Sequence, residues 1–177
     1  MAMRFTSVST SDLRGRVAAP GLAAAIAFVA LACGGAGTSQ KRIGFELSGD
    51  DGQPVSAAGF RGKILVVHVF TTWSLPAQDD ALRLEKAFGS DDRVVVVGVV
   101  IDREAQTVIG AWRRGMEVSY PIAIASDAVR YGESDLGETG AVPFTVVLDR
   151  EGRLIHRIPV PLGEAGIGEI RRLAGLK

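Results

Sequence analysis

The sequence predicts an α/β domain with a mixed central β-sheet and helices on both of its faces. Two runs rich in β-branched residues, ILVVHVF (64–70) and RVVVVGVVI (93–101), have the composition of parallel strands that are buried on both faces. A helical pattern lies between them, which is the order of a βαβ unit. A later hairpin pattern, FTVVLDREGRLIHRI (144–158), adds two antiparallel strands, so the expected sheet is mixed.

The expected helices follow from the spacing of apolar residues. Between the two strand runs, apolar residues recur at intervals of four, three and four: Ala77, Ala81, Leu84 and Phe88. Asp79 and Arg83 have the i,i+4 spacing of an ion pair on the outer side of this helix. A second helix is expected over 104–116. The amphipathic segment 163–176 closes the domain as a third.

Composition excludes several classes of function. The chain has 177 residues with 20 basic and 20 acidic side chains, so it carries no net charge that would indicate nucleic-acid binding. It contains one cysteine, Cys33. A disulfide scaffold, a thiolate zinc site and a two-cysteine redox cycle each need at least two sulfur atoms. We therefore expect none of these three.

The first 32 residues have the form of a secretory signal peptide. Residues 1–16 carry three arginines against one aspartate, and residues 17–32 form an uncharged apolar run that ends in small side chains. Sixteen helical residues span about 24 Å, which is shorter than the roughly 30 Å hydrocarbon core of a membrane. A cleaved signal is therefore expected rather than a permanent spanning helix.

The end of this leader resembles a bacterial lipobox. The motif ALACGG (30–35) places Cys33 where such proteins carry a diacylated N-terminal cysteine, although Ala30 differs from the usual leucine. The resemblance implies lipidation at Cys33, attachment to the membrane and an extracytoplasmic location. In Gram-negative lipoproteins, an aspartate after the lipidated cysteine usually signals retention at the inner membrane. Gly34 stands at that position, so the resemblance implies the outer membrane, facing the periplasm, if the cell is Gram-negative. Residues 33–42 are then the lipidated cysteine and a flexible tether. The alternatives are a plain cleaved signal and an uncleaved anchor.

Residues 43–177 resemble the thioredoxin-like superfamily, in particular its membrane-anchored TlpA and ResA-like redoxin branch. FELSGDDGQPVSAAGFRGK (45–63) resembles the hairpin that precedes the first central strand, and VHVFTTW (67–73) resembles the strand that leads to the active-site tryptophan. GAVPFTVVLDREGRLI (140–155) resembles the segment with the cis-proline and the following hairpin. Residues 120–140 match only loosely. The resemblance implies a thioredoxin-like fold with a cis bond at Val142-Pro143.

The sequence departs from this family at the two reactive positions. In place of two cysteines it has Ser74 and Ala77, within the motif Ser-Leu-Pro-Ala. A serine cannot form the mixed disulfide, and an alanine cannot resolve one. We therefore expect no catalytic residue of the family mechanism. Whether the chain is an enzyme is left open, with a non-enzymatic role favoured.

An alternative enzyme would pair Ser74 with His68, which the resemblance places beneath the first cysteine position. A structural role explains the same residues: Ser74 is a good helix N-cap with Pro76 in the first turn, and a histidine in an apolar strand is commonly a hydrogen-bonded core residue. Asp79 and Asp80 are expected in the first turn, where they would disfavour a further anion. A divergent redoxin-type oxidoreductase is the other alternative.

No cofactor and no metal site are expected. His156 lies in the predicted hairpin strand at a sheet edge and has no sulfur partner, although relatives that bind copper use paired cysteines with a histidine.

What remains of the family's active site is an apolar surface. The resemblance implies a peptide groove formed by Trp73, Leu75, Pro76, Val142 and Pro143. These residues are equally explained by the needs of the fold alone. The sequence thus predicts a membrane-anchored, thioredoxin-fold lipoprotein without redox cysteines, which serves as a binding or scaffolding module for an envelope protein or peptide.

Overall fold

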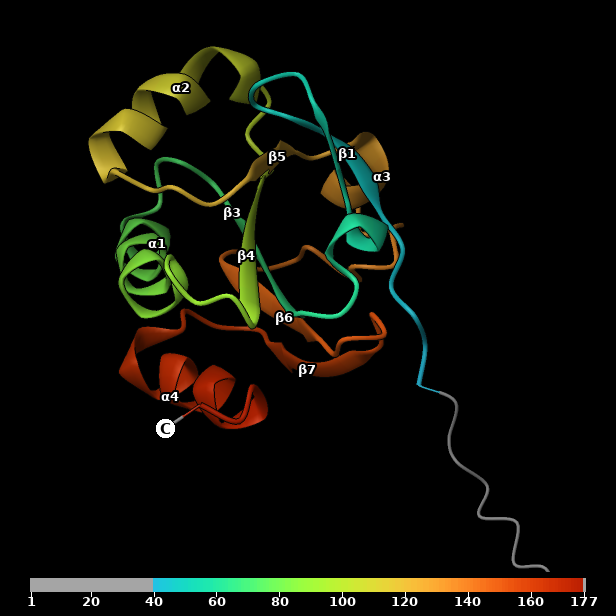
Figure 1. Ribbon diagram of the computed structural model, residues 1–177. Coiled ribbons are helices and arrows are strands. Elements are labelled where there is room, and N and C mark those ends of the chain that lie inside the picture. Colours follow the sequence, from blue (N-terminus) through green and yellow to red (C-terminus); the bar gives the residue numbers. More distant parts are fainter. Residues whose placement is uncertain (1–39, 177) are drawn as a thin grey trace, which may run out of the picture. The chain divides into compact units, whose positions relative to one another are not determined.

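The computed structural model describes residues 40–176, and the predicted signal peptide and Cys33 lie outside the described residues. The described chain forms a seven-stranded mixed sheet with the order β2-β1-β5-β4-β3-β6-β7 (Figure 1). Its strands are β1 (Glu46–Gly49), β2 (Pro54–Ser56), β3 (Ile64–Phe70), β4 (Val94–Val100), β5 (Ile122–Ile124), β6 (Phe144–Leu148) and β7 (Leu154–Ile158). The predicted α/β class with a mixed sheet is confirmed.

The centre of the sheet is the pair predicted from the two β-branched runs. β3 and β4 are parallel over their full length, from Ile64 opposite Val94 to Phe70 opposite Val100. β6 runs antiparallel to β3, and β7 runs antiparallel to β6. All seven residues of β3 are buried. This burial explains why the run is continuously apolar rather than alternating.

Four α-helices and one 3-10 helix complete the domain, and they cover both faces of the sheet as predicted. They are η1 (Ala57–Phe60), α1 (Leu75–Phe88), α2 (Ala105–Met116), α3 (Asp127–Arg130) and α4 (Gly163–Leu173). One apolar core lies beneath α1, α2 and α4, and a second lies beneath η1 and α3. α1 and α4 lie side by side (Figure 1).

Gly98 interrupts the valine run of β4 for a steric reason. A Cβ atom at this position would lie 3.1 Å from the Phe70 ring and 3.4 Å from the Tyr120 ring. Both rings therefore pack against the bare backbone, and the Phe70 ring also contacts Trp112 of α2 at a centroid distance of 4.9 Å.

Three short elements were not predicted from the sequence. β5 has three residues, and η1 and α3 have four each, so none gives a periodic pattern long enough to detect. The domain also begins earlier than the predicted boundary at Ile43. Lys41 O accepts a hydrogen bond from Leu154 N at 3.2 Å, and Arg42 forms a bridge with Arg153. The last two residues of the predicted tether are thus part of the domain.

No helix within residues 40–176 has both the length and the apolar character needed to cross a membrane.

Candidate functional site

The candidate site lies where β3 ends and α1 begins. Thr72 N donates to Asp102 Oδ2 at 2.8 Å, and Gln78 Nε2 donates to Thr72 O at 2.8 Å. These bonds join the turn between β3 and α1 to Asp102, which follows β4, and to Gln78 of α1. The site residues that follow Thr72 are therefore held on a defined backbone.

Ser74 and Ala77 occupy the two positions implied by the resemblance for reactive cysteines. Ser74 is the half-buried N-cap residue of α1, but its side chain makes no capping hydrogen bond. Ser74 thus takes the predicted N-cap position without the capping bond of its hydroxyl, and Pro76 lies in the first turn as predicted. Ala77 is completely buried. Neither position can supply a thiolate, so exchange through a thiol at this turn is chemically impossible.

His68 lies in the core and not at the surface of the site. Its side chain is fully buried, its Nδ1 lies 3.0 Å from Thr145 Oγ1, and its ring stacks on Phe70 with centroids 5.3 Å apart. Burial lowers the pKa of His68 to about 3, because the charged imidazolium loses its hydration. Such an imidazole is neutral at pH 7 and is a weak base.

The alternative Ser74 and His68 pair lacks its central contact. No hydrogen bond joins these two residues in the described part of the chain, and the hydrogen bond of His68 goes to Thr145 instead. His68 Nε2 is buried without a hydrogen-bond partner within residues 40–176. This arrangement is that of a hydrogen-bonded core histidine.

Two large apolar side chains are exposed at the start of α1. Trp73 is 75% exposed and Leu75 is 76% exposed. Pro76 beside them is also exposed. Two large apolar side chains are thus exposed within three residues of the chain, on either side of Ser74, and exposed apolar surface commonly marks an interaction site.

The cis-proline segment lies at the same end of the central strands, where β3 ends and β6 begins. Val142-Pro143 is a cis peptide bond, as predicted. Val69 of β3 is opposite Phe144 of β6 in an antiparallel pair, so the end of β3 and the start of β6 meet at one edge. Pro143 is buried there, and Val142 is half-buried. The register thus brings the second part of the predicted groove to the edge that carries Trp73 and Leu75.

A surface hollow of about 430 Å³ adjoins this segment. It is lined by Gly137, Glu138, Gly140, Ala141, Phe144, Arg157 and Pro159. The Arg157 guanidinium lies 4.2 Å from the centre of the Phe144 ring and donates to the carbonyl groups of Leu136 and Glu138. Burial lowers the pKa of Arg157. The guanidinium therefore fixes the loop before Pro143 onto β7.

The sequence did not predict that Arg157 binds the loop before Pro143, or that Val160 is exposed near that loop. Thr145 is opposite Ile158 in the pairing of β6 and β7, so the segment after Ile158 reaches the same edge as Pro143. Val160 is 55% exposed in that segment. The PVP motif at 159–161 directly after a predicted strand was the available signal, because it marks the place where the chain leaves the sheet.

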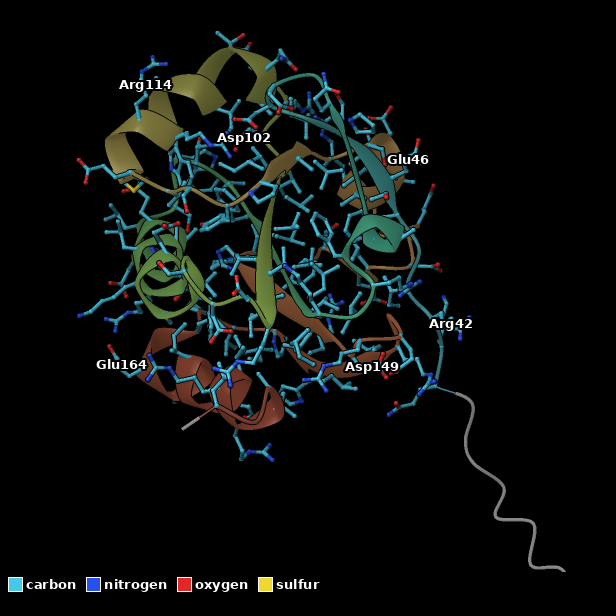
Figure 2. The ribbon with its side chains drawn as sticks, in the orientation of Figure 1. Arg42, Glu46, Asp102, Arg114, Asp149 and Glu164 are labelled. Carbon is cyan, nitrogen blue, oxygen red and sulfur yellow. The ribbon has the colours of Figure 1, made fainter. Side chains whose placement is uncertain are left out.

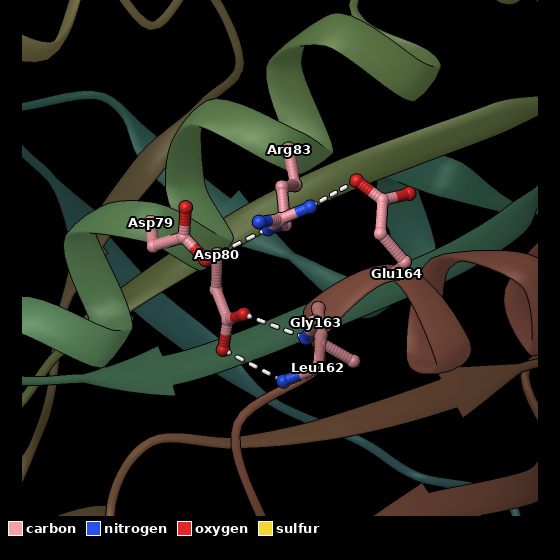
Figure 3. Close-up of polar contacts among 6 residues, drawn as sticks. All are labelled: Asp79, Asp80, Arg83, Leu162, Gly163 and Glu164. Carbon is pink, nitrogen blue, oxygen red and sulfur yellow. Dashed lines mark hydrogen bonds and ion pairs between the residues drawn. The ribbon is translucent and has the colours of Figure 1, made fainter.

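Asp79 and Asp80 do not lie in the first turn of α1, contrary to expectation. α1 begins at Leu75, so both carboxylates belong to the second turn, where they have little effect on an anion at the helix start. Asp79 forms the predicted pair with Arg83 at 2.7 Å, and Arg83 also contacts Glu164 of α4 (Figure 3).

Asp80 points inward and binds the start of α4. Its carboxylate accepts hydrogen bonds from Leu162 N at 2.9 Å and from Gly163 N at 3.1 Å (Figure 3). Asp80 is 1% exposed, and burial raises its pKa even though these two backbone donors act in the opposite direction. The carboxylate thus replaces the missing side-chain cap of α4.

His156 lies in β7 at the edge of the sheet, as predicted. Its Nε2 lies 3.6 Å from Glu169 Oε1 of α4. Within residues 40–176, no group of three or more histidine, cysteine, aspartate or glutamate side chains is arranged to hold a metal ion.

One protein-family model matches this sequence, and many solved structures have a similar fold. The family model described as Redoxin matches residues 36–170. A solved thiol:disulfide interchange protein of the thioredoxin family from Chlorobium tepidum is 25% identical, with a TM-score of 0.62 over 76% of this chain and 95% of that one. A secreted disulfide oxidoreductase from Mycobacterium tuberculosis is 18% identical, with a TM-score of 0.61 over 75% of this chain and 96% of that one.

A secreted thiol-disulfide isomerase from Corynebacterium glutamicum has a TM-score of 0.67 at 13% identity, over 76% of this chain and 84% of that one. These likenesses confirm the predicted thioredoxin-like fold. The family model covers most of the chain, including every strand and the residues around Ser74 and Pro143. This chain belongs to the Redoxin family.

Proposed function

We propose that this chain is a membrane-attached, extracytoplasmic member of the Redoxin family that binds an extended segment of an envelope protein and does not exchange disulfides. The observation that carries the proposal is the exposure of Trp73 and Leu75, at 75% and 76%, on either side of a serine that replaces the reactive thiol. The apolar surface is present although the sulfur chemistry is absent.

Three features support a peptide as the ligand. The exposed patch and the cis-proline segment share one edge of the sheet. The hollow beside Ala141 and Phe144 has room for a side chain of the ligand. The backbone at Val142 directly precedes β6, so an extended ligand segment can pair with it as an added strand.

Membrane attachment rests on Cys33 and its ALACGG motif. The extracytoplasmic location rests on the same leader, and it agrees with the secreted relatives named above. Intact mass spectrometry of the protein from its native membrane fraction tests this part. Cleavage before Cys33 with attached acyl chains is the expected result, and an unmodified Cys33 would contradict it.

Binding is tested by site-specific photo-crosslinking in cells that express the full chain. A photoreactive residue in place of Leu75 is expected to capture a defined envelope protein, and Trp73→Ala is expected to reduce that capture at least about tenfold, as for an aromatic anchor. The matched control is a photoreactive residue in place of Leu82, which is also on α1 and is 49% exposed. Equal capture from both positions, or no effect of Trp73→Ala, would contradict the binding role.

The absence of redox activity has its own test. In an insulin-reduction assay with dithiothreitol, the protein is expected to give the same rate as buffer, since Ser74 and Ala77 carry no thiol. A clear acceleration that Ser74→Ala abolishes would establish the enzymatic alternative.

A further inference from the structure

A charged surface lies near the amino end of β3, whereas Trp73 follows the carboxyl end of that strand. Three segments meet there: 41–43, 61–63 and 149–153. Ile43 N donates to Gly152 O at 3.0 Å, and Gly62 N donates to Arg150 O at 2.8 Å. The Arg61 guanidinium lies directly over Gly152, at the place that a Cβ atom would fill. We call this surface the basic pole; its cations are Lys41, Arg42, Arg61, Lys63, Arg150 and Arg153.

The cations of the basic pole outnumber its acids. The three segments hold six basic residues and two acidic ones, Asp149 and Glu151, and both acids contact Arg153. Lys41 is paired with Asp135 at 2.8 Å. The four remaining cations are exposed and have no ion pair within residues 40–176: Arg42, Arg61, Lys63 and Arg150.

This concentration contrasts with the rest of the domain. Residues 40–176 contain 16 basic and 19 acidic side chains. Without the six basic and two acidic residues of the basic pole, 10 basic and 17 acidic side chains remain, so the rest of the domain has a net negative charge. The turn before β4 adds Asp92 near Lys63, together with an Arg93 and Asp91 pair at 2.9 Å. One free carboxylate does not offset four unpaired cations.

The basic pole is also the place where the N-terminal part of the chain joins the domain. Lys41 and Arg42 belong to it, and 39 residues precede Gln40. In Figure 2, Arg42 and Asp149 lie in the lower right part of the domain, and Asp102, which accepts a hydrogen bond from Thr72 N, lies in its upper part. The described chain therefore enters the domain at the basic pole.

We propose that the basic pole docks on the anionic phospholipid headgroups of the membrane to which the chain is attached. Guanidinium groups bind phosphate oxygens through paired hydrogen bonds, and juxtamembrane Arg and Lys residues are attracted to anionic lipid surfaces. The occupant is a bilayer surface, because Lys41 and Arg42, which connect the domain to the predicted leader in the sequence, are themselves part of the basic pole. The inference rests on the proposed membrane attachment.

Docking by the basic pole orients the binding site. The start of α1 and the cis-proline segment lie at the carboxyl edge of β3, whereas Lys63 precedes its amino end. A strand of seven residues spans roughly 23 Å. With the basic pole on the lipid, Trp73 and Leu75 face away from the membrane and are open to a partner.

The test uses the full chain in lipid nanodiscs and measures hydrogen exchange by mass spectrometry. In discs with 30% phosphatidylglycerol, segments 40–43, 61–64 and 149–154 are expected to exchange more slowly than in pure phosphatidylcholine discs, and the slowing is expected to disappear at high salt. The triple variant Arg42→Gln, Lys63→Gln, Arg150→Gln is expected to lower the ratio of docked to undocked domain by roughly 100-fold.

The matched control removes three exposed cations elsewhere: Lys86→Gln, Arg103→Gln and Arg171→Gln. It has the same change in net charge and is expected to retain the slowing. Equal exchange in both lipids, or equal loss in the control, would overturn lipid docking by the basic pole. Neither result bears on the binding site, which the Trp73→Ala crosslinking experiment tests, or on acylation, which the mass of the native protein tests.

Discussion

The outer and inner sides of the first turns of α1 differ in how strongly they depend on the rest of the domain. On the outer side, Trp73 and Leu75 are exposed and the Ser74 side chain makes no capping bond. On the inner side, Asp80 of α1 is 1% exposed, and His68 of the preceding strand β3 is fully buried; each has a specific partner far along the chain. The outer side is therefore free to serve a partner, whereas the inner side contributes to the stability of the fold.

The largest expected effect is the pH dependence caused by His68. Its pKa is about 3 in the folded protein and has the ordinary value of 6.5 in the unfolded chain. As pH falls below 6.5, His68 becomes protonated in the unfolded chain but stays neutral in the folded protein, so the free energy of unfolding decreases. At pH 4 the decrease attributable to this group is roughly 3 kcal/mol.

Urea unfolding at a series of pH values measures this effect. In His68→Leu, the decrease in the free energy of unfolding that His68 causes below pH 6.5 is expected to be absent. The difference between the pH profiles of the two proteins therefore measures the contribution of His68. Asp80 acts in the opposite direction: its raised pKa means that its contribution to stability increases as pH falls through the folded pKa. Identical pH profiles for the two proteins would show that His68 is not the buried neutral group described above.

The next largest effect is expected for Asp80→Ala. This change leaves the backbone N–H groups of Leu162 and Gly163 without their acceptor at the start of α4. An unsatisfied buried donor is costly, so the free energy of unfolding is expected to fall by about 2 kcal/mol. The neighbouring Asp79→Ala is the control. Its exposed pair with Arg83 is worth less than about 1 kcal/mol, and an equal loss in both variants would remove the distinction between the two sides of α1.

The smallest effect is expected on the outer side, for Ser74→Ala. Since the hydroxyl makes no capping bond, the free energy of unfolding is expected to change by less than about 0.5 kcal/mol. Ser126→Ala is the matched comparison, because Ser126 Oγ does accept a bond from Val129 N at 3.4 Å. Its loss is expected to cost about 0.5–1 kcal/mol. A larger loss at Ser74 than at Ser126 would indicate a structural role that the contacts do not reveal.

Much of the fold was predictable, because its signals are local. β3 was predicted with the observed bounds, and α1, α2, α4 and the β6–β7 hairpin were predicted within a few residues, since each has a periodic or β-branched pattern of its own. Part of the candidate site was predicted from the family resemblance: Ser74 and Ala77 begin and end the Ser-Leu-Pro-Ala motif, and Trp73 directly precedes it.

The inward role of Asp80 was not predictable. The sequence shows two adjacent aspartates near a helix start, and nothing in that pattern tells which one is buried. The answer depends on α4, whose first residue is 83 positions away from Asp80. The same holds for the basic pole, since its cations come from three segments that only the pairing of the N-terminal residues with the β6–β7 turn brings together.

The sequence by itself determined that this protein has no reactive thiol pair and that two β-branched strands lie at the centre of its sheet, because composition and short-range periodicity decide both. Only the tertiary structure decided which polar residues are buried and that the cations of three distant segments gather near the amino end of β3. Those properties depend on contacts between distant segments, and a residue's burial is set by what packs over it.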